Sequence, residues 1–163
     1  MPTGPDIRTN LVKQIDKNAY ISVLERELFL KVAKHYSGLS DMAVPAWILC
    51  ASLVKKGGYL AIVVPETWLN RDYAAPIQYL ISKLFHIETI AKDITATWFS
   101  DAQVNTCLII AKRTDISDDN SDNVTTLLDL DEDGNIVHKS FQKTSSLFPN
   151  MYRTSIVPKW ALE

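Results

Sequence analysis

The chain has 163 residues, with 17 Lys and Arg against 19 Asp and Glu, a formal charge of −2 and a sequence pI near 5.9. Hydrophobic residues make up 47% and charged residues 22%, which is ordinary for a globular protein and excludes a disordered, collagen-like or coiled-coil chain. The charge balance is not basic, so the chain as a whole presents no broad positively charged surface that would attract nucleic acid. Only local basic patches could serve that purpose.

The sequence predicts a cytoplasmic protein without a membrane segment. Its first residues contain no apolar secretory core, and the longest apolar stretch, 42–54, is shorter than the roughly 20 residues that span a bilayer. Cys50 and Cys107 each lie in an apolar run without a nearby Cys or His. We therefore expect two buried free thiols, with no disulfide and no metal, which suits a reducing compartment.

Apolar periodicity predicts three helices in the first third of the chain. A short helix is expected near 7–15 and a clear amphipathic helix over 21–36. A third begins at the N-cap residue Ser40 and ends before Gly57-Gly58. This third helix is apolar almost all round, which predicts burial on every side.

The next segments predict a sheet. Tyr59–Pro65 is a continuous apolar run between Gly-Gly and Pro, typical of a central strand covered on both faces. A helix follows near 71–85, and then strands over 87–94 and 104–111. Because only a loop separates these last two strands, we expect an antiparallel pair at one end of a parallel sheet.

Beyond residue 113 the sequence predicts an acidic loop over 115–122 and a hairpin. Strands at 125–130 and 136–141 flank Asp133-Gly134, a hairpin turn signal. Residues 129–136 also match the front of a calcium-binding EF-hand loop, but Ser140 stands where the bidentate Glu should be, and the flanks are strand-like. We therefore favour an acidic hairpin turn over a calcium site.

Several catalytic signatures are absent from the sequence. The five glycines form neither a G-x-G-x-x-G loop nor a P-loop, and no H-E-x-x-H, paired cysteines or G-x-S-x-G occurs. His35, His86 and His138 are scattered near the ends of predicted elements. Capping or solvent exposure is the simpler interpretation for them, and we assign no catalytic and no metal-binding residue.

Residues 40–113 contain a set of more specific segments. These are Ser40-Asp41 before a buried helix, the run 53–69 with Lys-Gly-Gly and Pro-x-x-Trp-Leu, Tyr73, and the run 98–106, Trp-Phe-Ser-Asp-Ala-Gln-Val-Asn-Thr. Together they resemble the catalytic domain of gamma-class adenine-N6 DNA methyltransferases of restriction–modification systems. The match covers less than half of the chain.

The resemblance implies a target-base site in the run 98–106. Such enzymes flip the adenine out of the duplex, and Phe99 matches the aromatic residue that stacks on it, with Trp98 beside it. Asp101, Gln103 and Asn105 would face the DNA. A structural role for Trp98 and Phe99 in closing the end of the sheet stays open, and Asn105 and Thr106 also suit the start of a strand.

The chain departs from this family in its first half. The family binds S-adenosylmethionine with a glycine-rich loop and an acidic ribose ligand, and holds the amine with Asn-Pro-Pro-Tyr/Phe. This sequence has neither, and Met1-Pro2-Thr3-Gly4 is either a degenerate remnant of the second motif or a chance match. The complete enzyme would use S-adenosylmethionine, whereas this chain is expected to bind none and to be inactive alone.

The predicted fold class is α/β, a partial class I methyltransferase sheet of Rossmann-like type with a terminal antiparallel strand pair and a C-terminal hairpin region. Residues 1–113 would form the distal half of the methyltransferase-like domain, and 114–163 the start of a DNA-recognition region. The expected partners are DNA and either a proximal methyltransferase half, another subunit or a second copy. The alternative function is a degenerate, non-catalytic subunit that binds DNA or protein.

Overall fold

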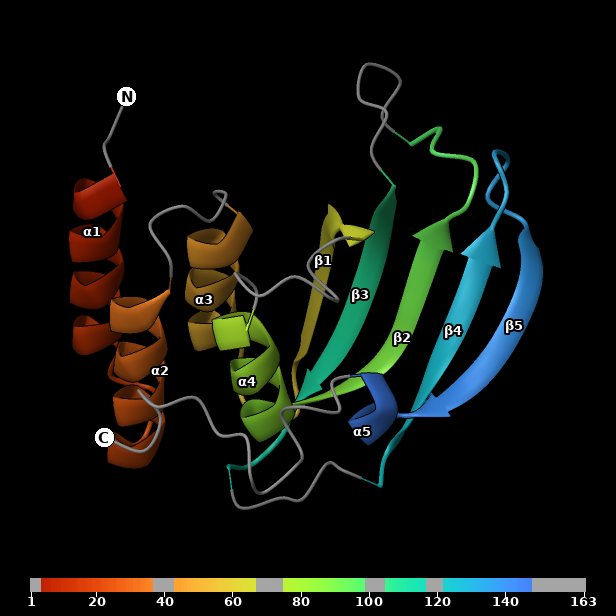
Figure 1. The fold of residues 1–163 in the computed structure, drawn as a ribbon. Coiled ribbons are helices and arrows are strands. Elements are labelled where there is room, and N and C mark those ends of the chain that lie inside the picture. Colours follow the sequence, from red (N-terminus) through yellow and green to blue (C-terminus); the bar gives the residue numbers. More distant parts are fainter. Residues whose placement is uncertain (1–3, 37–42, 67–74, 99–104, 117–121, 148–163) are drawn as a thin grey trace.

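The computed structural model describes residues 4–36, 43–66, 75–98, 105–116 and 122–147 (Figure 1). In chain order its elements are α1 (Gly4–Lys17), α2 (Val23–His35), α3 (Ala43–Leu53), β1 (Tyr59–Pro65), α4 (Ala75–Leu84), β2 (Phe85–Asp93), β3 (Thr106–Arg113), β4 (Val124–Leu130), β5 (Ile136–Lys143) and α5 (Thr144–Leu147). The mixed α/β class is as predicted.

Five strands form one mixed sheet in the order β1-β3-β2-β4-β5. β3 lies between β1 and β2 and is antiparallel to both, β4 runs parallel to β2, and β5 returns antiparallel to β4. The predicted antiparallel pairing of the second and third strands is confirmed. Their pair does not end the sheet, because β4 and β5 continue beyond β2.

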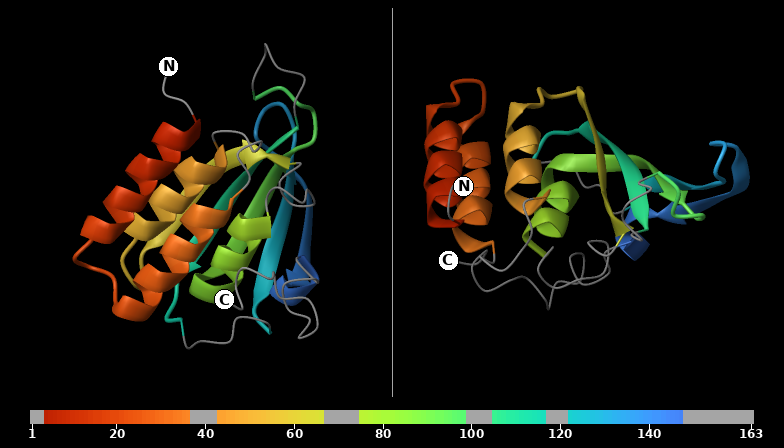
Figure 2. Two further views of the ribbon diagram at one scale, coloured as in Figure 1. Left: turned by 60° about the vertical axis from the view of Figure 1, so that its left-hand side comes forward. Right: turned by 90° about the horizontal axis from the view of Figure 1, so that it is seen from above.

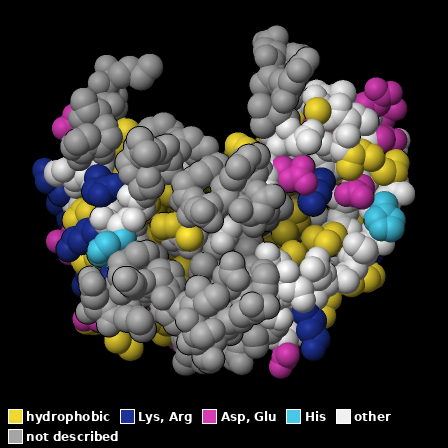
Figure 3. Space-filling model, viewed as in Figure 1, with side chains coloured by type: hydrophobic (Ala, Val, Ile, Leu, Met, Phe, Trp, Pro, Cys, Tyr) yellow, Lys and Arg dark blue, Asp and Glu magenta, His cyan; other side chains and the backbone are white. Residues whose placement is uncertain are grey.

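Helices α1 to α4 gather on one side of the sheet (Figure 2). α3 contacts β1, and α4 contacts β2. α2 packs against α1, α3 and α4. The core between the layers contains Phe29 and Trp47 from the helices and Ile87 and Ile109 from the strands, all with at most 1% of their surface exposed. Hydrophobic side chains remain visible over the strand part of the molecule (Figure 3).

β1 differs from the prediction of a central strand covered on both faces. It is the first strand of the described sheet, and only one of its faces is covered. Leu60 and Val64 are 7% and 2% exposed, whereas Tyr59 and Val63 on the opposite face are 55% and 46% exposed. The apolar composition of β1 would suit burial on both faces. Among the described residues, however, helices cover one face of β1 and one strand pairs with it.

α3 also differs from its prediction of burial on every side. Val44, Trp47, Ile48 and Ala51 are buried, but Leu53 is 70% exposed and Cys50 is exposed. The expectation of two buried thiols is therefore wrong for Cys50 and correct for Cys107. A helix that is apolar all round gives no sequence signal for the face that meets the core. Within the described ranges, no helix is long and apolar enough to cross a bilayer.

The C-terminal hairpin is confirmed. Gly134 adopts φ +79°, and the Asp131 carboxylate accepts hydrogen bonds from the backbone N–H groups of Asp133 and Asn135 at 3.0 and 2.8 Å. This carboxylate therefore closes the turn. Among the residues that the structure describes, no group of three potential metal ligands occurs. Since β4 pairs with β2, the hairpin extends the same sheet; the predicted boundary at residue 113 stays a prediction.

The helix boundaries follow local signals. α1 runs further at both ends than the predicted 7–15. Ser22 is the N-cap of α2, where its hydroxyl accepts the Glu25 backbone N–H at 3.2 Å and donates to the Glu25 carboxylate at 3.1 Å. This reciprocal capping defines the start of α2. The predicted cap at Ser40 and the predicted helix start at 71 lie outside the described residues.

A buried ion pair ties the helices to the sheet. Glu25 in α2 and Arg113 at the end of β3 are 3% and 2% exposed, and their carboxylate and guanidinium groups are hydrogen-bonded. Lys56 adds a 3.4 Å contact to Glu25 and another of 3.4 Å to Asp115. The Glu25 carboxylate, through this hydrogen bond and its charge, raises the pKa of Lys56.

We expect Arg113→Met to destabilise the protein strongly. The variant keeps much of the side-chain volume but leaves the Glu25 carboxylate buried without its guanidinium, a loss that typically costs about 3–5 kcal/mol. Urea denaturation measures the free energy of unfolding. The double variant Glu25→Leu/Arg113→Met should recover much of the loss, because it removes the buried carboxylate that has lost its guanidinium partner.

Lys143→Ala is the matched control. It removes an ion pair with Asp122 that spans 3.9 Å, with the two side chains 66% and 93% exposed. Such a pair contributes at most about 1 kcal/mol. Equal effects of Arg113→Met and Lys143→Ala would contradict the role assigned to the buried pair.

Candidate functional site

The strand order brings three chain segments to one edge of the sheet. Because β3 is antiparallel to both neighbours, its first residues lie beside the last residues of β1 and β2. Pro65 pairs with Thr106, and Lys92 pairs with Cys107. We call this the strand-end edge; it consists of Pro65, Glu66, Lys92, Asp93, Asn105 and Thr106. It lies at the top of the sheet in Figure 1.

Two contacts join the segments across the strand-end edge. The Glu66 backbone N–H donates to the Asn105 carbonyl at 2.8 Å, which continues the β1–β3 ladder by one residue. The Lys92 ammonium lies 3.1 Å from the Glu66 carboxylate, with both side chains about one-third exposed (34% and 35%). The ends of all three strands are therefore tied together.

Asp93, the last residue of β2, organises the turn that follows. Its side chain is buried, with 2% exposure for the residue. One carboxylate oxygen accepts the Trp98 backbone N–H at 2.8 Å, and the other accepts the Thr95 hydroxyl at 3.1 Å. Inside this turn Ala96 has φ +54°, a left-handed conformation that a residue with a Cβ seldom adopts. The carboxylate thus supports an unusual backbone path.

These contacts also set the protonation state of Asp93. Burial alone raises the pKa of the carboxyl group, but the hydrogen bonds from Trp98 and Thr95 favour the charged form and bring the pKa below its ordinary value of 3.8. The carboxylate is therefore ionised at neutral pH. It accepts both hydrogen bonds in that form.

Two of the predicted site residues lie among the described residues: Asn105 belongs to the strand-end edge, and Trp98 is bonded to it through Asp93. Trp98 is half-buried at the end of the Asp93 turn, and Asn105 is exposed immediately before β3. Thr106 begins β3, as predicted, and its buried hydroxyl has no hydrogen-bond partner among the residues that the structure describes. Phe99, Asp101 and Gln103 lie outside the described residues. Their segment is flanked by Trp98 and Asn105.

Sequence reasoning missed Asp93, Glu66 and Lys92. The signal for Asp93 was local, since a Thr two residues after an Asp is typical of a side-chain-closed turn. Glu66 and Lys92 carry no such signal, because their pairing depends on the strand order. The three histidines lie near element ends as predicted: His35 ends α2, and His86 and His138 are near the starts of β2 and β5.

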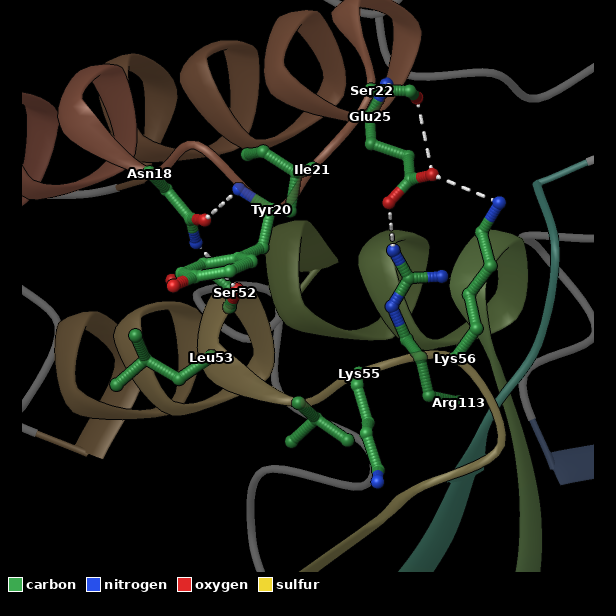
Figure 4. A pocket seen from close by; sticks show the side chains of 11 residues that line it. Asn18, Tyr20, Ile21, Ser22, Glu25, Ser52, Leu53, Lys55, Lys56 and Arg113 are labelled. Atoms are coloured by element: carbon green, nitrogen blue, oxygen red, sulfur yellow. Dashed lines mark hydrogen bonds and ion pairs between the residues drawn. The ribbon is translucent and has the colours of Figure 1, made fainter.

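A pocket of about 540 Å³ lies at the opposite end of β3 (Figure 4). Tyr20, Leu53, Lys55 and Lys56 contribute to its walls, and the Glu25–Arg113 ion pair lies at one side. Since Arg113 is the last residue of β3 and Thr106 the first, the length of the strand separates this pocket from the strand-end edge. It is not part of the candidate site.

No protein-family model matches the sequence, and no curated protein matches it. Among solved structures, the type IIG restriction endonuclease BpuSI is similar with a TM-score of 0.57 and 12% identity over 90% of this chain. The fold is thus one found in a restriction enzyme. The M protein of the type I restriction enzyme EcoKI matches 56% of this chain with a TM-score of 0.48 and 19% identity. This chain spans 18% of the BpuSI chain and 20% of the EcoKI M protein.

The described residues do not fit an S-adenosylmethionine site. The charged side chains of the strand-end edge already have partners, because Glu66 pairs with Lys92 and Asp93 binds its own turn. The sequence also has no glycine-rich loop through which backbone amides approach a nucleotide.

The two thiols should differ in reactivity. Burial raises the pKa of Cys107 to about 12, helped by the negative charge of Glu66 and opposed by Lys92. Cys107 therefore stays protonated and protected at pH 8, whereas Cys50 is exposed on α3. We expect a disulfide reagent such as DTNB to modify one thiol rapidly in the native chain and both in urea. Cys50→Ser should abolish the rapid phase; two equally fast phases in the native chain would contradict the burial of Cys107.

Proposed function

We propose that this chain is part of a site-specific adenine-N6 DNA methyltransferase of the gamma class, as found in restriction–modification systems. It supplies the side of the active site that receives the target base. The complete enzyme transfers a methyl group from S-adenosylmethionine to adenine in DNA, and this chain is inactive alone.

The main support for this proposal is that two sequence motifs converge at the strand-end edge. Pro65 belongs to the Pro-x-x-Trp-Leu motif, and Trp98 and Asn105 belong to the motif about 30 residues later. Pro65 is the last residue of β1, Asn105 precedes β3, and the Trp98 backbone N–H is bonded to Asp93 at the end of β2, which supports a shared site. In open α/β sheets, ligands bind beside the carboxyl ends of strands, which supports a site here.

The chemistry proposed for this edge is recognition of a flipped adenine. The exocyclic amine is inaccessible inside a duplex, so the base must leave the stack and be held on a platform. Phe99 would stack on the base, with Trp98 beside it, and Asp101, Gln103 and Asn105 would face the DNA. Asp115 lies beyond the other end of β3, bound to Lys56, so its charge does not repel phosphates at this edge.

The methyl-donor half would be supplied by a proximal methyltransferase segment that pairs with β1. β1 borders one other described strand, and its Tyr59 and Val63 are exposed. An apolar strand with an unpaired edge is a template for a further strand. Another subunit or a second copy of the chain are the other candidates for this surface.

A second candidate function is a non-catalytic subunit that binds DNA or protein. It is favoured by Met1-Pro2-Thr3-Gly4, which lies roughly where the family has Asn-Pro-Pro-Tyr and lacks the amide and the aromatic ring. Both functions share the DNA contact. They differ in whether a proximal half restores methyl transfer to DNA.

The base-stacking proposal is tested with two DNA duplexes. One carries an adenine opposite an abasic position, which lowers the cost of flipping, and the other lacks that adenine. The wild-type chain should prefer the first duplex in a fluorescence anisotropy titration. Phe99→Ala should lose about 1–3 kcal/mol of this preference, because base–aromatic stacking contributes that much.

Phe141→Ala is the matched control. Phe141 is 64% exposed on β5, at the far side of the sheet from β1, and its removal should leave the preference unchanged. If Phe99→Ala and wild type discriminate equally between the two duplexes, Phe99 is not the base platform.

A further inference from the structure

The pocket at the last residue of β3 has walls from three parts of the chain. They are the connection between α1 and α2, the end of α3 with the residues that follow it, and Arg113 (Figure 4). Its volume of about 540 Å³ is in the range of pockets that hold small molecules. A molecule bound there would contact both the helical layer and the sheet.

One wall of the pocket is apolar and open to solvent. Tyr20 and Leu53 are 99% and 70% exposed, and their sequence neighbours Ile21 and Val54 are partly buried. Tyr20 and Leu53 come from different segments but lie on the same side of the pocket (Figure 4). Single exposed apolar side chains are common on protein surfaces, whereas an apolar wall within a cavity is typical of ligand sites. This wall suits a flat apolar molecule.

The Asn18 side chain holds the apolar wall together. Its NH2 group donates to the Ser52 carbonyl at 2.8 Å, and its carbonyl oxygen accepts the Tyr20 backbone N–H at 2.9 Å. Tyr20 is thereby fixed beside the end of α3, where Leu53 follows Ser52. A ligand would meet a wall that is already assembled, which lowers the entropic cost of binding.

The opposite side of the pocket is charged. Glu25, Arg113 and Lys56 lie there (Figure 4). The Glu25 carboxylate contacts both cations, and Asp115 brings a second carboxylate within 3.4 Å of Lys56, so these charges are balanced. Lys55 also lines the pocket and is exposed. It forms no ion pair with any residue that the structure describes, so its ammonium group can pair with the single charge of a bound anion.

We propose that this pocket binds a small aromatic carboxylate. The aromatic body lies against Tyr20 and Leu53, and the carboxylate pairs with Lys55. The inference is independent of the proposed methyltransferase function, because the pocket and the strand-end edge lie at opposite ends of β3. A ligand that binds only the folded chain also stabilises it against unfolding.

Three probe molecules separate the two parts of the proposed ligand. Naphthoate has the aromatic body and the carboxylate, naphthamide has the body without the charge, and acetate has the charge without the body. In NMR titrations of the full chain, naphthoate should shift the amide signals of residues 18–25, 52–56 and 113. Naphthamide should bind roughly fivefold more weakly, which is the upper effect of an exposed ion pair. Acetate should cause no saturable shift.

Tyr20→Ala and Lys55→Gln test the two contacts separately. Both side chains are exposed, so the substitutions leave the core and the Glu25–Arg113 pair in place. Tyr20→Ala should weaken the binding of naphthoate and of naphthamide by about fivefold, because both lose the aromatic contact. Lys55→Gln should lower the affinity for naphthoate to that for naphthamide and leave naphthamide binding unchanged.

Phe141→Ala and Lys139→Gln are the matched controls. Both side chains are exposed on β5 and neither lines the pocket, so neither variant should change the affinity for naphthoate. The inference is overturned if naphthoate leaves the amide signals around the pocket unshifted. It is also overturned if naphthoate binds wild type, Tyr20→Ala and Lys55→Gln equally, or if naphthamide binds as tightly as naphthoate.

Discussion

The antiparallel insertion of β3 between β1 and β2 is the constraint on which the other features depend. It places the start of β3 beside the ends of its two neighbours, so that residues 66, 92 and 105 meet although they are far apart in the sequence. The Glu66–Asn105 and Lys92–Glu66 contacts exist only because of this order. A sheet in which β2 and β3 formed an outer pair beside a parallel set would not assemble the same edge.

The two ends of β3 have different roles. At its last residue, the Arg113–Glu25 pair holds the helical layer against the sheet. Removing one partner of such a pair destabilises the protein, because the other charge stays in the interior without it. At its first residues, the sheet presents polar groups and the Asp93 turn. Stability and the proposed recognition of DNA are thus separated by the length of one strand, and variants at one end should have little influence on the other.

Local signals and tertiary context explain which features were predictable. Gly57-Gly58 and Pro65 punctuate β1, and Asp133-Gly134 marks the hairpin, so these bounds follow from the sequence. The exposure of Val63 and Cys50 does not, because apolar composition shows that a surface is suited to burial but not what covers it. The Glu66–Lys92 pair depends on the strand order, so no local sequence pattern predicts it. Phe99, the main candidate from the sequence, lies outside the described residues.

The central claim is that this chain forms one side of a methyltransferase site and needs a further segment for the methyl donor. Isothermal titration calorimetry of S-adenosylmethionine into the purified chain tests it most directly. We expect no binding, because the sequence has no glycine-rich loop and the acidic groups of the strand-end edge are already engaged. Binding with micromolar affinity would contradict the claim, since it would require a complete donor site within these 163 residues.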